Sequence, residues 1–253
     1  MFSVIICSID AKRFAAVKAM YQRAFQSQPW ELIHIGDARS LAEGYTRGIA
    51  QSSGDLIILS HDDIDIFSPQ MPQRLERHLS EFDVVGVLGT TRLSSPTWFW
   101  AGPPFLFGQV VNSGPDGRLT VFILGAPSAV ARDIQAIDGL FMAARRSVFS
   151  RVGFDAVTFD GFHFYDLDFS YSAFRAGLRV AVANDICILH ASRGTYDERW
   201  ALYAAKFMQK WFPGKAVPQE RFQWTGIEVE NREQALAIMM PRYGLDHSNE
   251  KAG

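Results

Sequence analysis

The clearest pattern in the chain is an uninterrupted apolar run that ends in a group of polar and charged residues. Residues 56–59 read Leu-Ile-Ile-Leu with no alternation, and residues 60–65 read Ser-His-Asp-Asp-Ile-Asp. A short continuous apolar run is typical of a strand that is buried on both faces of a parallel sheet. Ligands of such open sheets bind beyond the carboxyl ends of the strands. The pattern therefore predicts a polar ligand site directly after residue 59.

Strand and helix patterns alternate before this run and continue after it. Apolar runs predict strands, and apolar residues at helical spacing predict helices, in the order 3–7, 14–25, 31–35, 41–49 and 56–59. A third helix over 71–82 and a strand over 84–88 follow. This alternation is the repeating unit of a parallel sheet with right-handed crossovers. We therefore predict an α/β fold with a Rossmann-like, mostly parallel sheet flanked by helices.

Residues 90–136 interrupt the pattern and read as an aromatic-rich insertion. Pro, Gly and aromatic residues crowd residues 95–107, and only residues 119–124 read as a strand. Loops of this length in a compact domain are usually functional or mobile. A hydrophobic flap under the domain and an acceptor-binding wall explain the insertion equally well, and contact with a membrane surface is a third alternative.

Regular patterns return in the second half of the chain. They predict a strand over 137–144, a helix that starts at Asp166, a strand that delivers His190 at its end, and a long helix over 196–211. We expect one domain over 1–211, divided into segments 1–89, 90–136 and 137–211. A C-terminal, partly helical extension follows over 212–253.

Composition limits the classes of function. The 25 basic and 27 acidic residues are balanced and form no basic stripe, which argues against a nucleic-acid partner. Cys7 and Cys187 both lie in apolar runs, which favours buried thiols in a reducing compartment. The chain begins directly in a strand pattern, and no apolar run approaches the roughly 20 residues of a spanning helix. We therefore expect a soluble, cytoplasmic protein.

The acidic stretch itself suggests a metal. Asp62, Asp63 and Asp65 repel one another unless a cation lies among them or each carboxylate is solvated separately. Oxygen-rich clusters of this kind suit Mg²⁺ or Mn²⁺, which in turn suit a diphosphate substrate. Taken alone, a solvated acidic turn after a buried strand accounts for the same residues.

The order of motifs resembles family 2-like glycosyltransferases with the GT-A fold. The motifs are Gly-Asp-Leu-Ile-Ile-Leu-Ser-His-Asp-Asp, Asp-Gly-Leu-Phe-Met-Ala-Ala-Arg-Arg, Val-Gly-Phe-Asp, Tyr-Asp-Leu-Asp-Phe-Ser and an apolar strand that ends in His. The likeness covers residues 1–211, matches poorly over 90–135, and is closest to the bacterial branch whose metal motif reads His-x-Asp. It implies sugar transfer from a nucleoside-diphosphate sugar, of UDP type, to a hydroxyl of a glycan or lipid-linked acceptor. The resemblance also implies a role in bacterial surface-polysaccharide synthesis. It further implies peripheral contact with the inner face of the membrane.

The resemblance also implies a donor site. Asp63 corresponds to the acid that binds Mn²⁺ or Mg²⁺, Asp65 takes its place if the register shifts by one step, and His190 completes the metal site. His61 replaces the family's first acid. The resemblance implies that His61 and Asp62 contact the donor. The remaining nucleoside contacts are expected at the ends of the first two strands, at Cys7, Ser8, Ile9, Asp10 and Asp37.

Asp166 is the general base that the resemblance implies. The family carries a Glu-Asp pair here, whereas this chain reads Tyr165-Asp166 and keeps only the second acid. A carboxylate that comes from a different segment than the metal ligand suits a single inverting displacement. For Asp168, a structural role in which it contacts Arg175 or the helix start is at least as well supported as a catalytic one. Aromatic residues suited to excluding water are Trp98, Trp100, Phe162, Phe164 and Tyr165.

Two other classes of function stay open at this point. The loss of two family acids is also compatible with a non-catalytic nucleotide-sugar-binding or scaffold protein on the same fold. A metal-dependent phosphohydrolase that uses His61 and Asp62 is less favoured, because such sites usually draw further His ligands from a helical scaffold.

Overall fold

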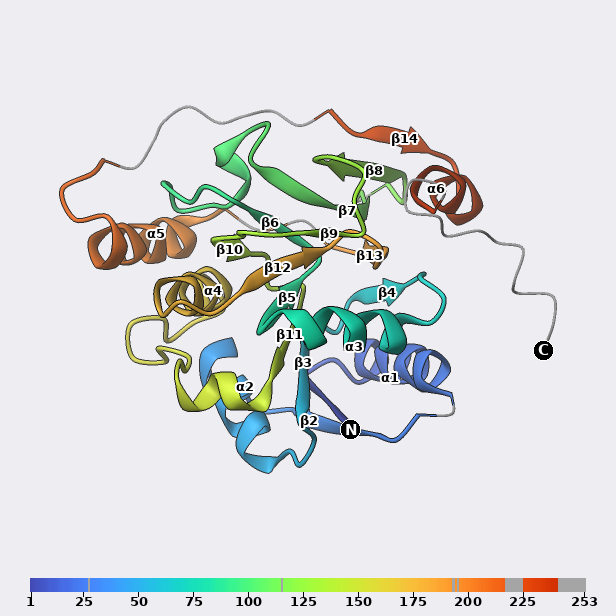
Figure 1. Ribbon diagram of the computed structural model, residues 1–253, viewed down its shortest axis with the longest axis horizontal. Helices are drawn as coiled ribbons and strands as arrows, with labels where there is room; N and C mark the ends of the chain where they lie inside the picture. Colours follow the sequence, from blue (N-terminus) through green and yellow to red (C-terminus); the bar gives the residue numbers. More distant parts are fainter. Residues whose placement is uncertain (27, 115, 193, 195, 217–224, 241–253) are drawn as a thin grey trace.

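The computed structural model describes residues 1–240 except 27, 115, 193, 195 and 217–224, and these residues form two sheets (Figure 1). The first sheet has the strand order β2-β1-β3-β11-β5-β12-β9. Strand β1 is parallel to β2 and β3, β5 is parallel to β12, and β11 runs antiparallel between β3 and β5. Its strands are β1 (Phe2–Cys7), β2 (Trp30–Ile35), β3 (Leu56–Ser60), β5 (Val84–Gly86), β9 (Val130–Ala131), β11 (Phe141–Arg145) and β12 (Val180–Ala183).

Helices cover both faces of this sheet, so the predicted α/β fold is confirmed. Alternate side chains of β1 divide between the two faces. Val4 packs in one core cluster with Val17 of α1, and Ile5 packs in the other with Tyr45 of α2. The helices are α1 (Ala11–Phe25), α2 (Leu41–Gln51), α3 (Met71–Glu81), α4 (Tyr165–Arg175), α5 (Glu198–Trp211) and α6 (Arg232–Met239), with 3₁₀ turns η1 (Phe99–Ala101) and η2 (Arg146–Ser150).

The position of β1 between β2 and β3 creates a switch point. The crossover through α1 leads to one side of β1, and the crossover through α2 leads to its other side. A crevice opens beyond the carboxyl ends of the strands where crossovers diverge in this way. The residues that follow β1 and β3 therefore lie at the place where a ligand is expected.

The second sheet is mixed and has β10-β6-β7-β13-β4 as its main path. Strand β8 pairs with β7, and β14 pairs with β8. Figure 1 shows this sheet beside β12 and β9, at one end of the first sheet. Its strands are β4 (Ile64–Ile66), β6 (Leu88–Thr90), β7 (Leu106–Ser113), β8 (Leu119–Leu124), β10 (Ala136–Ile137), β13 (Ile188–His190) and β14 (Ile227–Val229).

Two strand predictions are wrong in detail, because the chain passes from one sheet to the other, and one strand was not predicted. The strand predicted over 84–88 is divided at Val87 between β5 and β6. The strand predicted over 137–144 is broken, because the Asp138 carboxylate accepts a hydrogen bond from Leu140 N at 3.0 Å and turns the chain. Strand β7 lies in the stretch that reads as irregular, where neighbouring Pro and aromatic residues hide its pattern.

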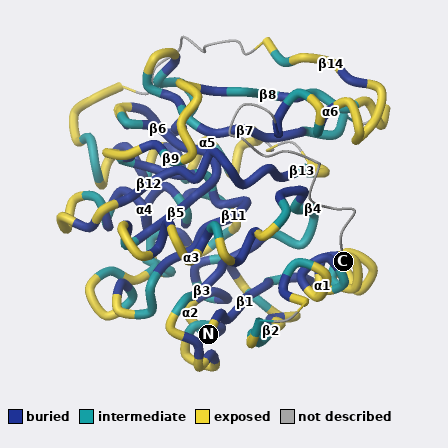
Figure 2. Tube along the Cα trace, turned by 45° about the vertical axis from the view of Figure 1, so that its right-hand side comes forward, coloured by how far each residue is buried: buried dark blue, intermediate teal, exposed yellow. Residues whose placement is uncertain are grey.

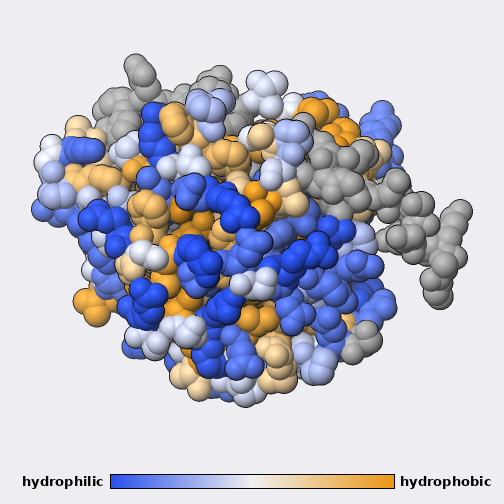
Figure 3. All heavy atoms as spheres, viewed as in Figure 1, coloured by the Kyte–Doolittle hydropathy of each residue, from blue (hydrophilic) through white to orange (hydrophobic). Residues whose placement is uncertain are grey.

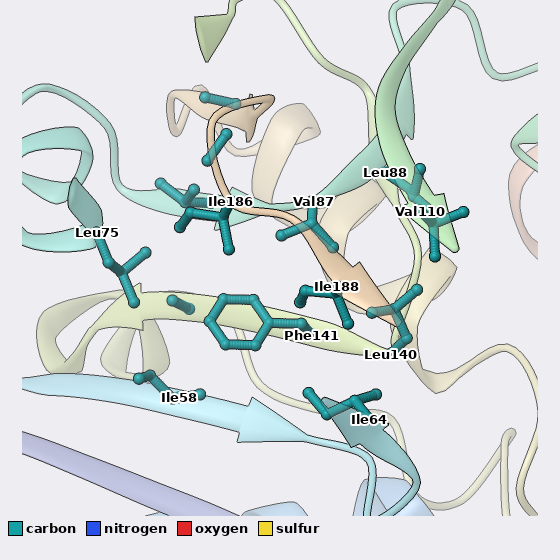
Figure 4. Close-up of a cluster of buried hydrophobic side chains, with 14 of the residues drawn as sticks. Ile58, Ile64, Leu75, Val87, Leu88, Val110, Leu140, Phe141, Ile186 and Ile188 are labelled. Atoms are coloured by element: carbon teal, nitrogen blue, oxygen red, sulfur yellow. The ribbon is translucent and has the colours of Figure 1, made fainter. Parts of the chain in front are cut away.

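The core lies between the two sheets as well as under the helices. In Figure 4, Ile58 of β3, Phe141 of β11, Val110 of β7 and Ile188 of β13 point into one cluster. Figure 2 shows the central strands buried along most of their length, whereas β14 and many loops are exposed. On the face in Figure 3, apolar side chains appear between hydrophilic ones. The two cysteines are free thiols, with Cys187 buried and Cys7 partly buried, as predicted.

The predicted extension over 212–253 lies partly outside the described residues, namely over 217–224 and 241–253. Its described part contains β14 and α6. Ala235 and Met239 of α6 are buried in a cluster with Val111 of β7 and Phe67. Each helix in the described part of the chain falls short of the length and hydropathy that a membrane-spanning helix needs.

A buried ion pair ties α3 to the turn between β12 and β13. The Asp185 carboxylate accepts hydrogen bonds from His78 Nε2 at 2.7 Å and from Arg74 Nη1 at 3.2 Å. Asp185 is 1% exposed and His78 is 5% exposed. Removing one partner of a buried pair leaves the other charges uncompensated in a low-dielectric environment.

We therefore expect Asp185→Ala to lower the free energy of unfolding by about 3–5 kcal/mol. The matched control is Glu81→Ala on α3, the helix that carries the partners of Asp185, because Glu81 pairs with Arg132 at the surface. Exposed pairs of that kind contribute at most about 1 kcal/mol. Urea unfolding followed by circular dichroism compares the two variants, and equal losses of stability would show that burial of Asp185 is unimportant.

Candidate active site

The residues after β1 and β3 meet at the switch point. Ser8 Oγ donates a hydrogen bond to Asp62 Oδ2 at 2.6 Å. Asp10 caps α1 by accepting hydrogen bonds from the backbone N–H groups of Lys12 and Arg13. Arg13 also lies 4.0 Å from the Asp62 carboxylate. The structure thus brings together three of the residues predicted to contact the donor, Ser8, Asp10 and Asp62.

The other predicted nucleoside contacts surround this point differently. Ile9 is 90% exposed beside Ser8. Cys7 is partly buried, and burial raises the pKa of its thiol to about 12. Asp37 is exposed after β2 and forms a bidentate ion pair with Arg47. Ile9 and Asp37 are therefore accessible to a ligand, whereas Cys7 mainly packs beneath α2.

His61, Asp63 and His190 form a compact group of possible metal ligands. One possible ligand atom of each residue lies within 4.8 Å of the other two. In the described part of the chain, these three residues are the group that could hold a metal ion. Asp63 Oδ1 is 3.4 Å from His190 Nε2 and 3.9 Å from His61 Nδ1. The pairing of β4 with β13 sets His190 opposite Ile64, the residue after Asp63.

Neighbouring charges tune this group. Burial opposes ionisation of Asp63, but the hydrogen bond from His190 and its charge outweigh burial and hold the pKa of Asp63 below its ordinary value. Burial, followed by the charge of His190, lowers the pKa of His61. For His190, burial lowers the pKa, but the contact with Asp63 raises it more. The group therefore favours an ionised carboxylate beside one neutral imidazole.

Asp65 lies apart from this group. Its carboxylate pairs with Arg232 of α6, and the guanidinium of Arg232 lies 4.2 Å from the centre of the Phe67 ring. The structure brings Asp63 and His190 together, and it turns Asp65 toward the C-terminal extension.

A cavity of about 520 Å³ opens next to the histidines. His61, His190, Asp138 and Asp166 all border it. The insertion contributes part of the wall, and the start of α4 with the loop before it, the segment after β13 and Trp200 of α5 contribute other parts. Its aromatic lining residues are Trp98, Phe99, Phe122, Phe162, Phe164, Tyr165, Tyr196 and Trp200. Of the aromatics predicted to exclude water, Trp100 alone does not line the cavity; it packs on Trp200 with ring centres 6.0 Å apart.

The two acids at the start of α4 face different surroundings. Asp166 Oδ2 accepts a hydrogen bond from Gly139 N at 2.8 Å at the cavity. Asp168 is buried and accepts hydrogen bonds from Lys210 Nζ and Trp211 Nε1, both at 2.8 Å. Asp168 thus anchors α5 to α4. This position agrees with the structural role considered for Asp168. Its partners, however, are Lys210 and Trp211, whereas Arg175 or the helix start was expected.

Asp138 is a candidate site residue that the sequence reasoning did not single out. Its carboxylate accepts hydrogen bonds from Leu140 N and from Trp98 Nε1, the latter at 2.8 Å. Burial, followed by the charge of Asp138, raises the pKa of Asp166 to about 7. The only signal in the sequence is an Asp-Gly pair within an apolar run, which predicts a turn.

The chain matches the family described as "Glycosyltransferase like family" over residues 3–211. It belongs to this family. The predicted resemblance to glycosyltransferases of family 2 type is therefore confirmed. No curated protein sequence matches the chain.

The chain is also similar to solved structures of low sequence identity. One is GalNAc-T7 with UDP, GalNAc and Mn²⁺, at 12% identity and a TM-score of 0.48, covering 76% of this chain and 44% of that one. Another is the mannosyltransferase PcManGT from Pyrobaculum calidifontis with GDP-Man and Mn²⁺, at 12% identity and 0.49, covering 86% and 65%. A third is S. aureus TarS 1-349 with UDP-GlcNAc, at 11% and 0.46, covering 82% and 66%. This chain thus spans less than half of GalNAc-T7.

The residues present fit a divalent cation. Two ligands on one ion lie at most about 4.2 Å apart, because metal–ligand bonds to nitrogen and oxygen are about 2.1 Å long. Both distances from Asp63 Oδ1 to the imidazole nitrogens are below this limit. A carboxylate and two imidazoles are common ligands of divalent transition metals.

We expect Asp63→Ala to weaken Mn²⁺ binding by more than about 100-fold, since loss of an outer partner alone weakens binding by about 10- to 100-fold. Asp65→Ala is the matched control, because its carboxylate pairs with Arg232 instead. It should retain Mn²⁺ affinity within a factor of about 2. Isothermal titration calorimetry measures both. A larger loss in Asp65→Ala would move the site one step along the chain.

Proposed function

We propose that this protein is a metal-dependent, inverting glycosyltransferase that moves a sugar from a nucleoside-diphosphate sugar to an acceptor hydroxyl. One observation carries the proposal. The cavity that is bordered by His61 and His190 of the metal group is also bordered by Asp166, a partly buried carboxylate from a different segment. A cation group and a base at one cavity are the two functions that sugar transfer requires.

The donor is proposed to lie across the switch point. Ser8, Ile9, Asp10 and Asp62 would contact the nucleoside, and Asp63 with His190 would place the diphosphate. A divalent ion held there supplies Lewis-acid stabilisation of the charge that develops on the leaving phosphate. The UDP-type donor and the role in bacterial surface-polysaccharide synthesis are parts of this proposal that rest on the family resemblance.

Asp166 is proposed to take the proton of the acceptor hydroxyl as it attacks. Its carboxylate is held toward the cavity by Gly139 N, so one oxygen is fixed while the other can accept a proton. A pKa of about 7 suits a base that works near neutral pH. Because Asp166 comes from a different segment than Asp63, base and metal can stand on opposite sides of the anomeric carbon, so a single displacement with inversion is the expected course.

The aromatic lining would bind the acceptor and exclude water. Transfer to an acceptor competes with hydrolysis of the donor, so a desolvated cavity favours transfer. Trp98 belongs to the insertion and donates a hydrogen bond to Asp138. This contact supports an acceptor wall as the role of the insertion. A glycan or lipid-linked acceptor and peripheral contact with the membrane stay within this proposal.

Purified protein incubated with nucleotide sugars, Mn²⁺ and a library of glycan acceptors tests the function. Transfer of sugar with inverted anomeric configuration supports it. Nucleotide binding with no transfer to any acceptor favours the scaffold alternative, and release of inorganic phosphate favours the phosphohydrolase.

We expect Asp166→Asn to lower kcat by about 10²- to 10⁴-fold, as loss of a general base does, and to leave nucleotide affinity unchanged. Asp168→Asn is the matched control two residues away, because its partners lie on α5. It should keep kcat within a factor of about 3 and lose about 1–2 kcal/mol of stability with the Lys210 pair. Wild-type rates in Asp166→Asn would remove Asp166 from the chemistry.

The rate should also depend on pH through Asp166. The base must be ionised, and burial with Asp138 raises its pKa to about 7, so kcat should fall about tenfold per pH unit below pH 7. Asp138→Asn removes the neighbouring charge, which lowers the pKa of Asp166 and moves the acidic limb to lower pH. Asp168→Asn should leave the limb in place. A limb that Asp138→Asn does not move would contradict this coupling.

A further inference from the structure

Two positions at which this chain departs from the family pattern contact each other. By the family resemblance, His61 stands where the metal motif has its first acid, and Tyr165 stands where a Glu precedes Asp166. They are 104 residues apart in sequence, yet His61 Nε2 lies 2.7 Å from Tyr165 Oη. Tyr165 is 4% exposed, and the His61 side chain is 26% exposed at the cavity that both residues line.

We propose that Tyr165 is a positioning residue that holds His61 as the third ligand of the metal site, through Nδ1. The inference rests on the proposed metal-dependent function and deepens it, because the resulting ligand set selects the class of cation. It assigns a role to the tyrosine that replaces the family's Glu.

The hydrogen bonds around Tyr165 determine the tautomer of His61. Tyr165 Oη also lies 3.2 Å from Gly139 O, to which it donates its proton. Among the described residues no other donor contacts this carbonyl. A carbonyl only accepts, so we assign the phenol proton to Gly139 O, and in this arrangement the phenol accepts from His61 Nε2–H. Nδ1 is then unprotonated.

The approach of Tyr165 to Gly139 depends on the glycine. A Cβ at position 139 would lie 2.2 Å from Tyr165 Oη, closer than any real contact. Gly139 therefore admits the hydroxyl between its own carbonyl and the imidazole. The Asp-Gly turn that presents the Gly139 N–H to Asp166 also fixes the tyrosine.

The unprotonated Nδ1 faces the carboxylate of the metal group. It lies 3.9 Å from Asp63 Oδ1, which is in turn 3.4 Å from His190 Nε2. One ion placed among these atoms receives two imidazole nitrogens and one carboxylate oxygen. Imidazole nitrogen binds first-row transition-metal ions, more weakly for Mn²⁺ than for Co²⁺, whereas Mg²⁺ prefers oxygen ligands and octahedral geometry. The site should therefore take Mn²⁺ or Co²⁺ in preference to Mg²⁺.

Metal binding by the full chain, made metal-free, tests the inference without any sugar transfer. Calorimetric titration with Mn²⁺ alone and with Mg²⁺ alone gives the affinities, and nitrogen hyperfine coupling in the electron spin echo of bound Mn²⁺ reports the imidazoles. Wild type should bind Mn²⁺ at least about 10-fold more tightly than Mg²⁺ and show coupling to nitrogen. Equal affinities, or an absence of Mn²⁺ binding, overturn the selectivity.

Tyr165→Phe keeps the ring and removes the hydroxyl. We expect Mn²⁺ affinity to fall by about 10- to 100-fold, as for other partners that orient a metal-bound histidine. The effect should vanish when His61 is already replaced by Ala, since the tyrosine acts through the imidazole. Unchanged affinity in Tyr165→Phe, or the same loss in the His61→Ala background, overturns the role of Tyr165.

Tyr45→Phe is the matched control. Tyr45 is a buried tyrosine whose ring lies 5.6 Å from that of Tyr165, but its hydroxyl donates to Ser60 O. It should keep Mn²⁺ affinity within a factor of about 2, and a loss equal to that of Tyr165→Phe would indicate a general packing effect instead. The proposed function fails separately, if wild type binds Mn²⁺ as expected but transfers no sugar.

Discussion

The candidate site depends on the backbone pairing of β4 with β13. His190 lies opposite Ile64 in this antiparallel pair, and Ala191 N donates to Asp63 O at 2.9 Å. Ile64 and Ile188 are buried in the core, so a slip of one residue would turn them out of it. The apolar side chains thus fix the register, and the register sets Asp63 against His190 before any ion binds.

Three acids lie near this cavity, and each is accommodated by a different means. Asp63 is stabilised as a carboxylate by His190, and Asp138 by the N–H groups of Trp98 and Leu140. Asp166 accepts a hydrogen bond from Gly139 N and has a pKa raised to about 7 by burial and by Asp138. Pairs of acids whose surroundings separate their pKa values can take different chemical roles. Here the pKa of Asp63 is lowered and the pKa of Asp166 is raised, so Asp166 is the acid suited to exchange a proton near neutral pH.

The second sheet connects the site to distant parts of the chain. It contains strands from the acidic stretch, the insertion, the segment before His190 and the C-terminal extension. Arg232 of the extension pairs with Asp65 and stacks on Phe67, which removes Asp65 from the metal group. Trp98 of the insertion reaches Asp138. The extension and the insertion, which are far apart in sequence, therefore each bind one carboxylate near the site, Asp65 and Asp138 respectively.

The sequence by itself determined the elements whose periodicity is strong. Apolar runs and helical spacing depend on neighbouring residues alone. They predict strands β1 and β3, helices α1 to α4, the polar stretch after β3 and the place of His190 at the end of β13. The distinction between Asp63 and Asp65 did not follow, because both acids are equally local and only Arg232, 167 residues away from Asp65, separates them. The tertiary structure likewise decided the contact of His61 with Tyr165, the coupling of Asp138 to Asp166, and the division of the chain at Val87 between two sheets. These features arise from residues far apart in sequence that share one desolvated space, where a single hydrogen bond or charge outweighs local preference.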